Sequence, residues 1–229
     1  VYYFFAYFKT YEKNEKINFS VPTGNFGDIY AGYVAKKMGL PINKLLIATN
    51  SNDILKRVVK TGVYKPQKVE QTVSPSMDIQ VASNFERLIF DIYANDSNKV
   101  LELMNDLNTN GEFNIGKEEL KKINANFCSE SLSVSETKLI INKIYSNQNI
   151  LIDPHTAVGV GVAEKIALEG NTIILSTAHP SKFSDVVMKE TKVKPELPDS
   201  LKHILISKEN YVKLNKDLKE VKNYILERA

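Results

Sequence analysis

The stretch SVPTGNFGD, residues 20–28, decides the fold class of this chain. It overlaps the segment INFSV at 17–21, which is typical of a short strand, and the apolar positions over 28–38 recur at helical spacing. A second apolar strand at 45–48 and a second helix at 53–60 come next. Because parallel strands need crossover connections, this alternation predicts an α/β fold with a parallel sheet.

Two glycines, Gly24 and Gly27, flank the turn between the first strand and the first helix. Backbone N–H groups in such a turn can approach an anion closely, and the helix N-terminus adds partial positive charge. The turn therefore predicts a phosphate cradle, with an ordinary tight turn as the alternative. It is not a dinucleotide fingerprint, since the third glycine is missing, nor a P-loop, since no Gly-Lys-Ser/Thr follows.

The pattern is less regular farther along the chain. Ser133 and Glu136 have the spacing of a capping box ahead of a helix. Near the end, apolar residues over 211–227 recur at helical spacing with lysines opposite, which predicts an amphipathic helix. The other expected elements are helices over 84–94, 98–107 and 155–169 and strands at 150–152 and 172–176.

The composition is that of an ordinary globular protein of 229 residues, with 43% hydrophobic residues, 25% charged residues and a net charge of +3. No long basic block indicates a nucleic-acid partner, and no apolar run is long enough to span a membrane. The one cysteine, Cys128, excludes an internal disulfide framework and favours a cytoplasmic location. One cysteine and three scattered histidines also argue against a metal site.

The chain opens on an aromatic, apolar run, VYYFFAYF at residues 1–8. Natural termini are usually polar and frayed, so this run predicts the middle of a buried helix whose beginning lies outside the sequence. It lacks the basic start and the cleavage site of a signal peptide.

Four segments, in order, resemble the threonine synthases of the bacterial and fungal type. They are SVPTGNFGDIYAG at 20–32, ATNSND at 48–53, the block of SMDI and SNFER within 76–87, and STAHPSKF at 176–183. The resemblance covers nearly the whole chain and thins over residues 95–130 and after about 190. Four ordered segments are far more specific than any one of them.

The resemblance implies the fold type II of pyridoxal 5′-phosphate (PLP) enzymes, similar to the tryptophan synthase β-subunit, with PLP at the carboxyl edge of the sheet. It implies that Gly24, Asn25, Phe26 and Gly27 hold the cofactor phosphate, largely through backbone N–H groups, and that the Thr177 hydroxyl bonds the pyridine nitrogen. The candidates for substrate contacts are Asn50, Asp78, Arg87, His155 and Lys182.

The substrate candidates also have structural interpretations. Asn50 and Asp78 fit turn-forming polar residues equally well. Arg87 fits an ordinary helix-surface arginine, and Lys182 fits an exposed lysine. His155 lies in a strand-to-helix turn, and its role stays open; the capping candidates for that helix are Asp153 and Thr156.

By resemblance, the activity is a lyase reaction of threonine biosynthesis that converts O-phosphohomoserine and water to L-threonine and phosphate. It needs a lysine in Schiff-base linkage with PLP. In the family that lysine lies in a Phe-Lys-Asp context before the phosphate loop, and no lysine here has that context. We therefore expect no catalytic residue in this chain, a catalytic lysine in a missing N-terminal half, and no turnover by the chain alone.

The expected organisation follows. Residues 1–195 would form the remnant of the PLP-binding α/β domain, incomplete at its N-terminus, and residues 196–229 a helical extension packed on it. Two other functions stay open: a threonine-synthase-like PLP lyase with a different substrate, and a short protein that binds a phosphate ligand without catalysis.

Overall fold

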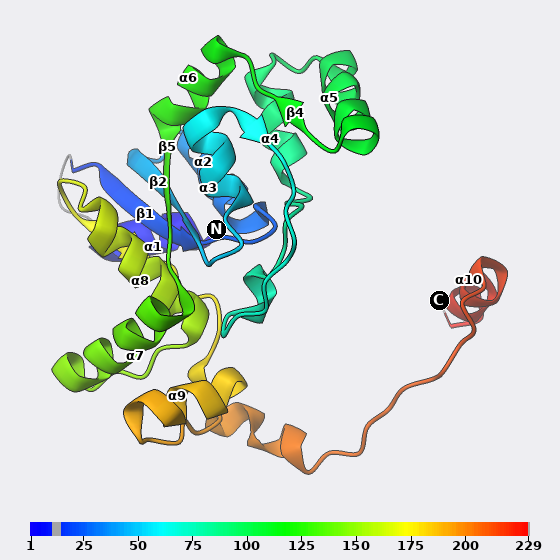
Figure 1. The fold of residues 1–229 in the computed structure, drawn as a ribbon. Helices are drawn as coiled ribbons and strands as arrows, with labels where there is room; N and C mark the ends of the chain where they lie inside the picture. Colours follow the sequence, from blue (N-terminus) through cyan, green and yellow to red (C-terminus); the bar gives the residue numbers. More distant parts are fainter. Residues whose placement is uncertain (11–14, 229) are drawn as a thin grey trace. The chain divides into compact units, whose positions relative to one another are not determined.

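The structure is a computed structural model, and it describes residues 1–10 and 15–228. The chain divides into two compact units, Val1–Pro195 and Glu196–Ala229 (Figure 1). The larger unit contains a parallel sheet with helices packed on it, which confirms the predicted α/β class.

A four-stranded parallel sheet in the order β5-β2-β1-β6 lies at the centre of the larger unit (Figure 1). Strand β1 pairs with β2 on one side and with β6 on the other, so Phe19 is in register with both Leu45 and Ile173. Every residue of β1 is buried, which makes it the central element. The strands are β1 (Ile17–Pro22), β2 (Ile42–Thr49), β5 (Phe127–Ser131) and β6 (Thr172–Ile174).

Helices cover both faces of this sheet. Helices α1 (Tyr2–Thr10) and α2 (Gly27–Lys37) lie on the face of Phe19, whose ring centroid is 4.9 Å from that of Tyr3. Helix α8 (Pro154–Ile166) lies on the other face, where the Ser20 hydroxyl donates to the carbonyl of Gly159 at 2.7 Å. Successive residues of a strand point to opposite faces, which is why Phe19 and Ser20 meet different helices.

The remaining elements of this unit flank the two layers. Helix α7 (Val134–Gln148) packs on α8 and begins with the predicted capping box, in which Ser133 and Glu136 each accept the backbone N–H of the other. The strands β3 (Val63–Tyr64) and β4 (Phe113–Asn114) form an antiparallel pair. The others are α3 (Ile54–Thr61), η1 (Pro75–Met77), α4 (Phe85–Ile92), α5 (Ser97–Asn110), α6 (Lys117–Asn126), η2 (Pro180–Phe183) and α9 (Ser184–Thr191).

One predicted strand was wrong, and one strand was not predicted. Residues 150–152 form no strand, because Asn149 ends α7 in the left-handed region and Asp153 already caps α8, so the three residues only connect two helices. The edge strand β5 was missed because its sequence, FCSES, is mostly polar and has no run of apolar residues.

The smaller unit contains η3 (Asp199–Leu205) and α10 (Leu218–Leu226). The helix expected over 211–227 begins only at Leu218, because the Asp217 carboxylate accepts the N–H of Glu220 at 2.8 Å and caps it there. That this unit packs on the larger one stays a prediction. In the part of the chain that the structure describes, no helix has the length and apolarity needed to cross a membrane.

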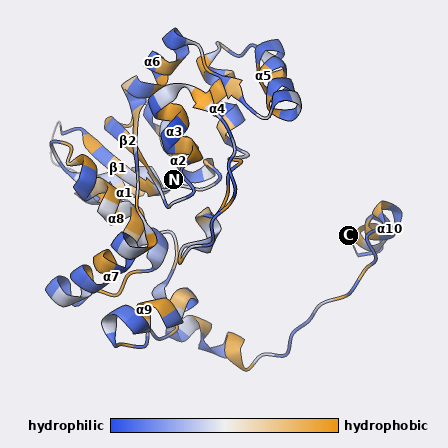
Figure 2. Cartoon of the chain, in the orientation of Figure 1, coloured by the Kyte–Doolittle hydropathy of each residue, from blue (hydrophilic) through white to orange (hydrophobic). Residues whose placement is uncertain are grey.

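Figure 2 shows hydrophobic and hydrophilic residues on the same helices of the larger unit, as expected of helices that pack on a sheet with one side only. Helix α1 fits this pattern in part: Tyr3 and Tyr7 are buried, whereas Phe5 and Phe8 are 60% and 68% exposed. The opening run therefore forms a helix as predicted, but with only one of its faces buried.

Close packing between α8 and the segment after β5 gives a test of this arrangement. A Cβ atom on Gly161 would lie 2.6 Å from a methyl carbon of Leu132. We therefore expect Gly161→Ala to lower the free energy of unfolding by about 1–3 kcal/mol, although Ala favours a helix over Gly by about 1 kcal/mol. Urea unfolding measures this cost. In a Leu132→Ala background the cost should shrink, and an equal cost in both backgrounds would contradict the packing.

Candidate active site

A cavity of about 220 Å³ lies at the carboxyl edge of the sheet. Strand β1 leads into the turn with Gly24 and Asn25, and β6 leads into the segment with Thr177. Because β1 and β6 pair in parallel, these two segments end side by side although they are far apart in the sequence. Ligands of open parallel sheets bind at this edge. The lining residues are Pro22, Gly24, Asn25, Asp28, Ser76, Met77, His155, Thr177, Ala178 and Lys182.

The turn that forms one wall is held in shape by Phe26. This residue has φ 71° and ψ 0°, in the left-handed region that costs a non-glycine residue free energy. Its side chain is fully buried, with ring centroids 5.2 Å from Phe85 and 5.8 Å from Phe127. The aromatic packing thus holds the backbone in this conformation, and helix α2 begins at the next residue, Gly27.

Three successive backbone donors of this turn are free. Within residues 1–10 and 15–228, the N–H groups of Gly24, Asn25 and Phe26 donate no hydrogen bond. The N–H of Gly27 donates to Asn25 Oδ1 at 2.9 Å, and the N–H of Asn84 donates to the Asn25 carbonyl at 3.0 Å. Free N–H groups beside a helix N-terminus have the chemistry of an anion site.

The turn closely approaches the 3₁₀ helix η1, and this explains Gly24. A Cβ atom on Gly24 would lie 2.9 Å from the carbonyl oxygen of Ser76 and 3.2 Å from Met77 Cα, both backbone atoms that cannot rotate away. Sequence reasoning missed Ser76 and Met77 as lining residues. The SMDI segment could have indicated them, because both residues belong to it, but only Asp78 was selected from that segment as a candidate.

The opposite wall carries polar side chains from α8 and from the segment after β6. Lys182 and Thr177 are exposed at the cavity, and His155 is buried beside them. The Lys182 ammonium lies 5.6 Å from the centroid of the Phe183 ring. With the free N–H groups of the first wall, the cavity therefore presents mostly hydrogen-bond donors; Asp28 is the carboxylate among the lining residues.

Asp153 fixes the start of α8 at this wall. Its carboxylate is fully buried and accepts hydrogen bonds from the N–H of His155 at 2.8 Å, the N–H of Thr156 at 3.4 Å and the Thr156 hydroxyl. Burial alone would raise the pKa of Asp153, but the hydrogen bonds from His155 and Thr156 lower it below its ordinary value. Asp153 is thus the helix cap that the sequence suggested.

Three candidates for substrate contacts lie outside the cavity. Asn50 and Asp78 bind each other, with Asn50 Nδ2 donating to Asp78 Oδ1 at 2.7 Å, in a network that includes Thr72 and Ser74. These contacts order the segment before η1, which agrees with the structural interpretation of both residues. Arg87 is exposed on α4 and does not line the cavity either.

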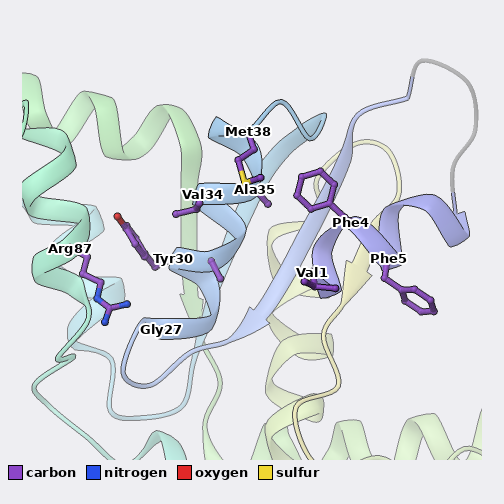
Figure 3. Close-up of a pocket in the computed structure, with 10 residues that line it drawn as sticks. Val1, Phe4, Phe5, Gly27, Tyr30, Val34, Ala35, Met38 and Arg87 are labelled. Atoms are coloured by element: carbon purple, nitrogen blue, oxygen red, sulfur yellow. The ribbon is translucent and has the colours of Figure 1, made fainter.

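A larger hollow of about 700 Å³ lies elsewhere, between α1 and α2, and Figure 3 shows it. Arg87 and Tyr30 lie at one side of it, Phe4 and Phe5 at the other, and Met38 at the end of α2. Its lining is mainly apolar and lacks the convergent polar groups of the cavity at the sheet edge. The candidate site is therefore the smaller cavity.

Replacing Asp153 tests its role as the anchor of this wall. We expect Asp153→Ala to lower the free energy of unfolding at pH 7 by about 2–4 kcal/mol, because the cap is lost and buried donors of His155 and Thr156 lose their acceptor. The pKa of Asp153 is lower in the folded state, so its stabilisation is present above pH 4 and is lost as the pH falls through the folded pKa. Chemical unfolding at pH 7 and pH 3.5 measures both effects; a difference that grows toward acid pH would contradict this account.

Comparison with known proteins finds similar chains in one family. The family profile described as threonine synthase, C-terminal, matches residues 156–225. The chain is 42% identical to threonine synthase of Saccharomyces cerevisiae over 99% of its own length and 50% of that relative, and 38% identical to that of Pseudomonas aeruginosa over 98% and 49%. The crystal structure of a PLP-bound threonine synthase from Brucella melitensis is similar with a TM-score of 0.92 and 44% identity, over 100% of this chain and 50% of that one.

The chain thus spans about half the length of the curated relatives it matches. Sequence identity, family profile and fold all indicate the same group of proteins. We conclude that the chain belongs to the threonine synthase family, of whose members it represents the C-terminal portion.

Proposed function

We propose that this chain forms the cofactor-phosphate side of a PLP-dependent lyase that converts O-phosphohomoserine and water to L-threonine and phosphate. The observation that carries the proposal is the cavity where the free N–H groups of Gly24, Asn25 and Phe26 meet Thr177, Lys182 and His155. Such a set of donors suits a ligand with a phosphate group and a ring nitrogen. The similar PLP-bound enzyme of Brucella melitensis supports this choice of ligand.

The residues of the two walls fit PLP. The turn at 24–27 would hold the phosphate through backbone N–H groups, and Asn25 Oδ1 would have to share or release the N–H of Gly27. The Thr177 hydroxyl would bond the ring nitrogen, which suits a neutral pyridine because a hydroxyl, unlike a carboxylate, does not demand its protonation. When bound, PLP supplies an electron sink for the carbon next to the amino group.

The chain's own groups would orient the substrate. The Lys182 ammonium would attract the phosphate of O-phosphohomoserine, and Pro22 and Met77 add apolar surface to the lining of the cavity. We propose that the Schiff-base lysine belongs to a segment outside this chain. Asn50 and Asp78 would act indirectly, since their mutual hydrogen bonds order the segment that leads to Ser76.

We further propose that the partner of this chain is the remaining half of a threonine synthase. Val1, Phe5 and Met38 line the hollow between α1 and α2 and are 99%, 60% and 71% exposed. A contiguous apolar surface of this kind is typical of an interface. A full-length member of the family has about twice the length of this chain, which leaves enough chain to cover it. A cytoplasmic location fits the one cysteine and the biosynthetic reaction.

Borohydride reduction with PLP tests whether this chain binds the cofactor while the Schiff-base lysine lies in a segment outside it. The 229-residue chain is mixed with PLP, reduced and mapped by peptide mass spectrometry. We expect weak binding that inorganic phosphate competes for, no lysine labelled stoichiometrically, and no phosphate release from O-phosphohomoserine. One lysine labelled to completion would mean that the chain carries its own Schiff-base residue, and absence of phosphate-sensitive binding would reject the cavity as the cofactor site.

Gly24→Ala tests the cradle itself. The added Cβ would force Ser76 and the turn apart and misplace the free N–H groups, so we expect affinity for PLP to fall at least about tenfold. Equilibrium dialysis with PLP measures this. Gly161→Ala is the matched control, because it adds the same methyl group at another tight contact far along the chain and should leave the affinity unchanged. Equal affinities of Gly24→Ala and the wild type would contradict the proposed cradle.

A further inference from the structure

His155 is the one buried titratable side chain among the residues that line the cavity. It lies in the first turn of α8, its side chain is 5% exposed, and its ring centroid is 4.7 Å from that of Phe183. The burial and the ring contact hold the imidazole in one orientation. Its position in the cavity wall is therefore fixed before any ligand arrives.

Asp153 sets which ring nitrogen carries the proton. Asp153 Oδ1 lies 2.9 Å from His155 Nδ1, and the same carboxylate already accepts the N–H groups of His155 and Thr156. The lowered pKa of Asp153 keeps it ionised, and an ionised carboxylate only accepts hydrogen bonds. Nδ1 is therefore the donor, and the neutral ring presents the lone pair of Nε2.

Nε2 is a buried polar atom without a partner among the described residues. Buried polar groups are nearly always hydrogen-bonded, and leaving one unpaired is costly. The cavity that His155 lines is small: 220 Å³ is roughly seven times the volume of a water molecule. His155 belongs to the lining of this cavity, so a ligand larger than phosphate that fills the cavity lies against the wall that contains His155.

The other groups at the cavity favour an anion. The charged residues that face His155 there are Lys182 from η2, Asp28 from α2 and Asp153 from its own helix cap. The Asp28 carboxylate already accepts a hydrogen bond from the Tyr3 hydroxyl at 3.2 Å. The Asp153 carboxylate already accepts hydrogen bonds from the first turn of α8. Lys182 and the free N–H groups remain as donors for an anionic ligand, whereas Nε2 of a neutral imidazole would offer it only a lone pair.

We propose that His155 takes up one proton from solvent when a phosphorylated ligand fills this cavity, and then donates Nε2–H to an anionic oxygen of that ligand. The one bond formed is Nε2–H, with the proton supplied by solvent, and the resulting imidazolium is held between the Asp153 carboxylate and the ligand. His155 is thus a ligand-binding residue whose charge follows occupancy, and Asp153 is its positioning residue. This inference rests on the proposed function of the cavity as the cofactor site.

Calorimetry with pyridoxine 5′-phosphate tests this inference, because this probe has the ring and phosphate of PLP but no aldehyde to react with lysines. Titrations at pH 8 in buffers of different ionisation heat count the protons taken up. A free histidine is mostly neutral at this pH, so we expect the wild type to take up roughly half a proton or more per ligand. Nitrogen NMR of the ¹⁵N-histidine-labelled chain should show Nε2 of His155 becoming protonated.

Variants of His155 and of a control histidine test whether His155 is the residue that takes up the proton. His155→Gln keeps an amide donor but cannot titrate, so it should bind with little proton uptake; His155→Ala should bind about 10- to 100-fold more weakly. His179→Gln is the control, since His179 is exposed, bonds Ser181 and does not line the cavity, and it should match the wild type. Thermal unfolding confirms that each variant is folded.

The outcomes separate this inference from the proposed function. Binding with no proton uptake, or equal uptake by His155→Gln and the wild type, overturns the role of His155 but leaves the cofactor site in place. No binding of the probe by the wild type rejects the site and this inference together. Inorganic phosphate as a second ligand separates the possible sources of the oxygen: uptake with phosphate alone indicates a phosphate oxygen, and uptake only with pyridoxine 5′-phosphate indicates contact with the ring-bearing ligand.

Discussion

The structure depends on the parallel pairing of β1 with both of its neighbours. Every residue of β1 is buried, so its backbone groups must be satisfied within the sheet, and β2 and β6 provide the partners. This constraint brings the turn after β1 to the same edge as the segment after β6. Residues that are more than a hundred positions apart in the sequence thereby line one cavity. The capped N-terminus of α8 lies at the same edge of the sheet.

Phe26 connects the hydrophobic core to the cavity. Its ring is locked between Phe85 and Phe127, and this packing holds its backbone in a conformation that is unfavourable for the residue alone. The local free-energy cost is offset by burial of an aromatic side chain in the core. As a result the backbone of the turn is held in one conformation beside the cavity. The side chain of Phe26 thus packs in the core, and its backbone forms part of the turn beside the cavity.

The two walls differ in how they are prepared for a ligand. The turn offers fixed backbone dipoles, which need no change of protonation to hold a phosphate. The wall on α8 offers a histidine whose partner, Asp153, is buried, so the proposed change of protonation would occur at this wall. The exposed apolar hollow between α1 and α2 has neither feature and is better suited to contact with more polypeptide. One chain therefore combines a polar ligand site with an apolar surface suited to association.

By itself, the sequence determined the α/β class, the strand-turn-helix unit around Gly24, the capping box at Ser133 and the family, because each of these depends on local spacing or on ordered motifs. It did not predict β5, since a polar edge strand exists only through pairing with β2. For Asn50 and Asp78 the sequence left a substrate contact and a structural role open, and the fold pairs them with each other. Only the tertiary structure decided how α8 and the segment after β6 bring His155, Thr177 and Lys182 opposite Gly24 and Asn25. It also decided that Nε2 of His155 has no partner among the described residues, because both facts arise from contacts between segments that are distant in the sequence.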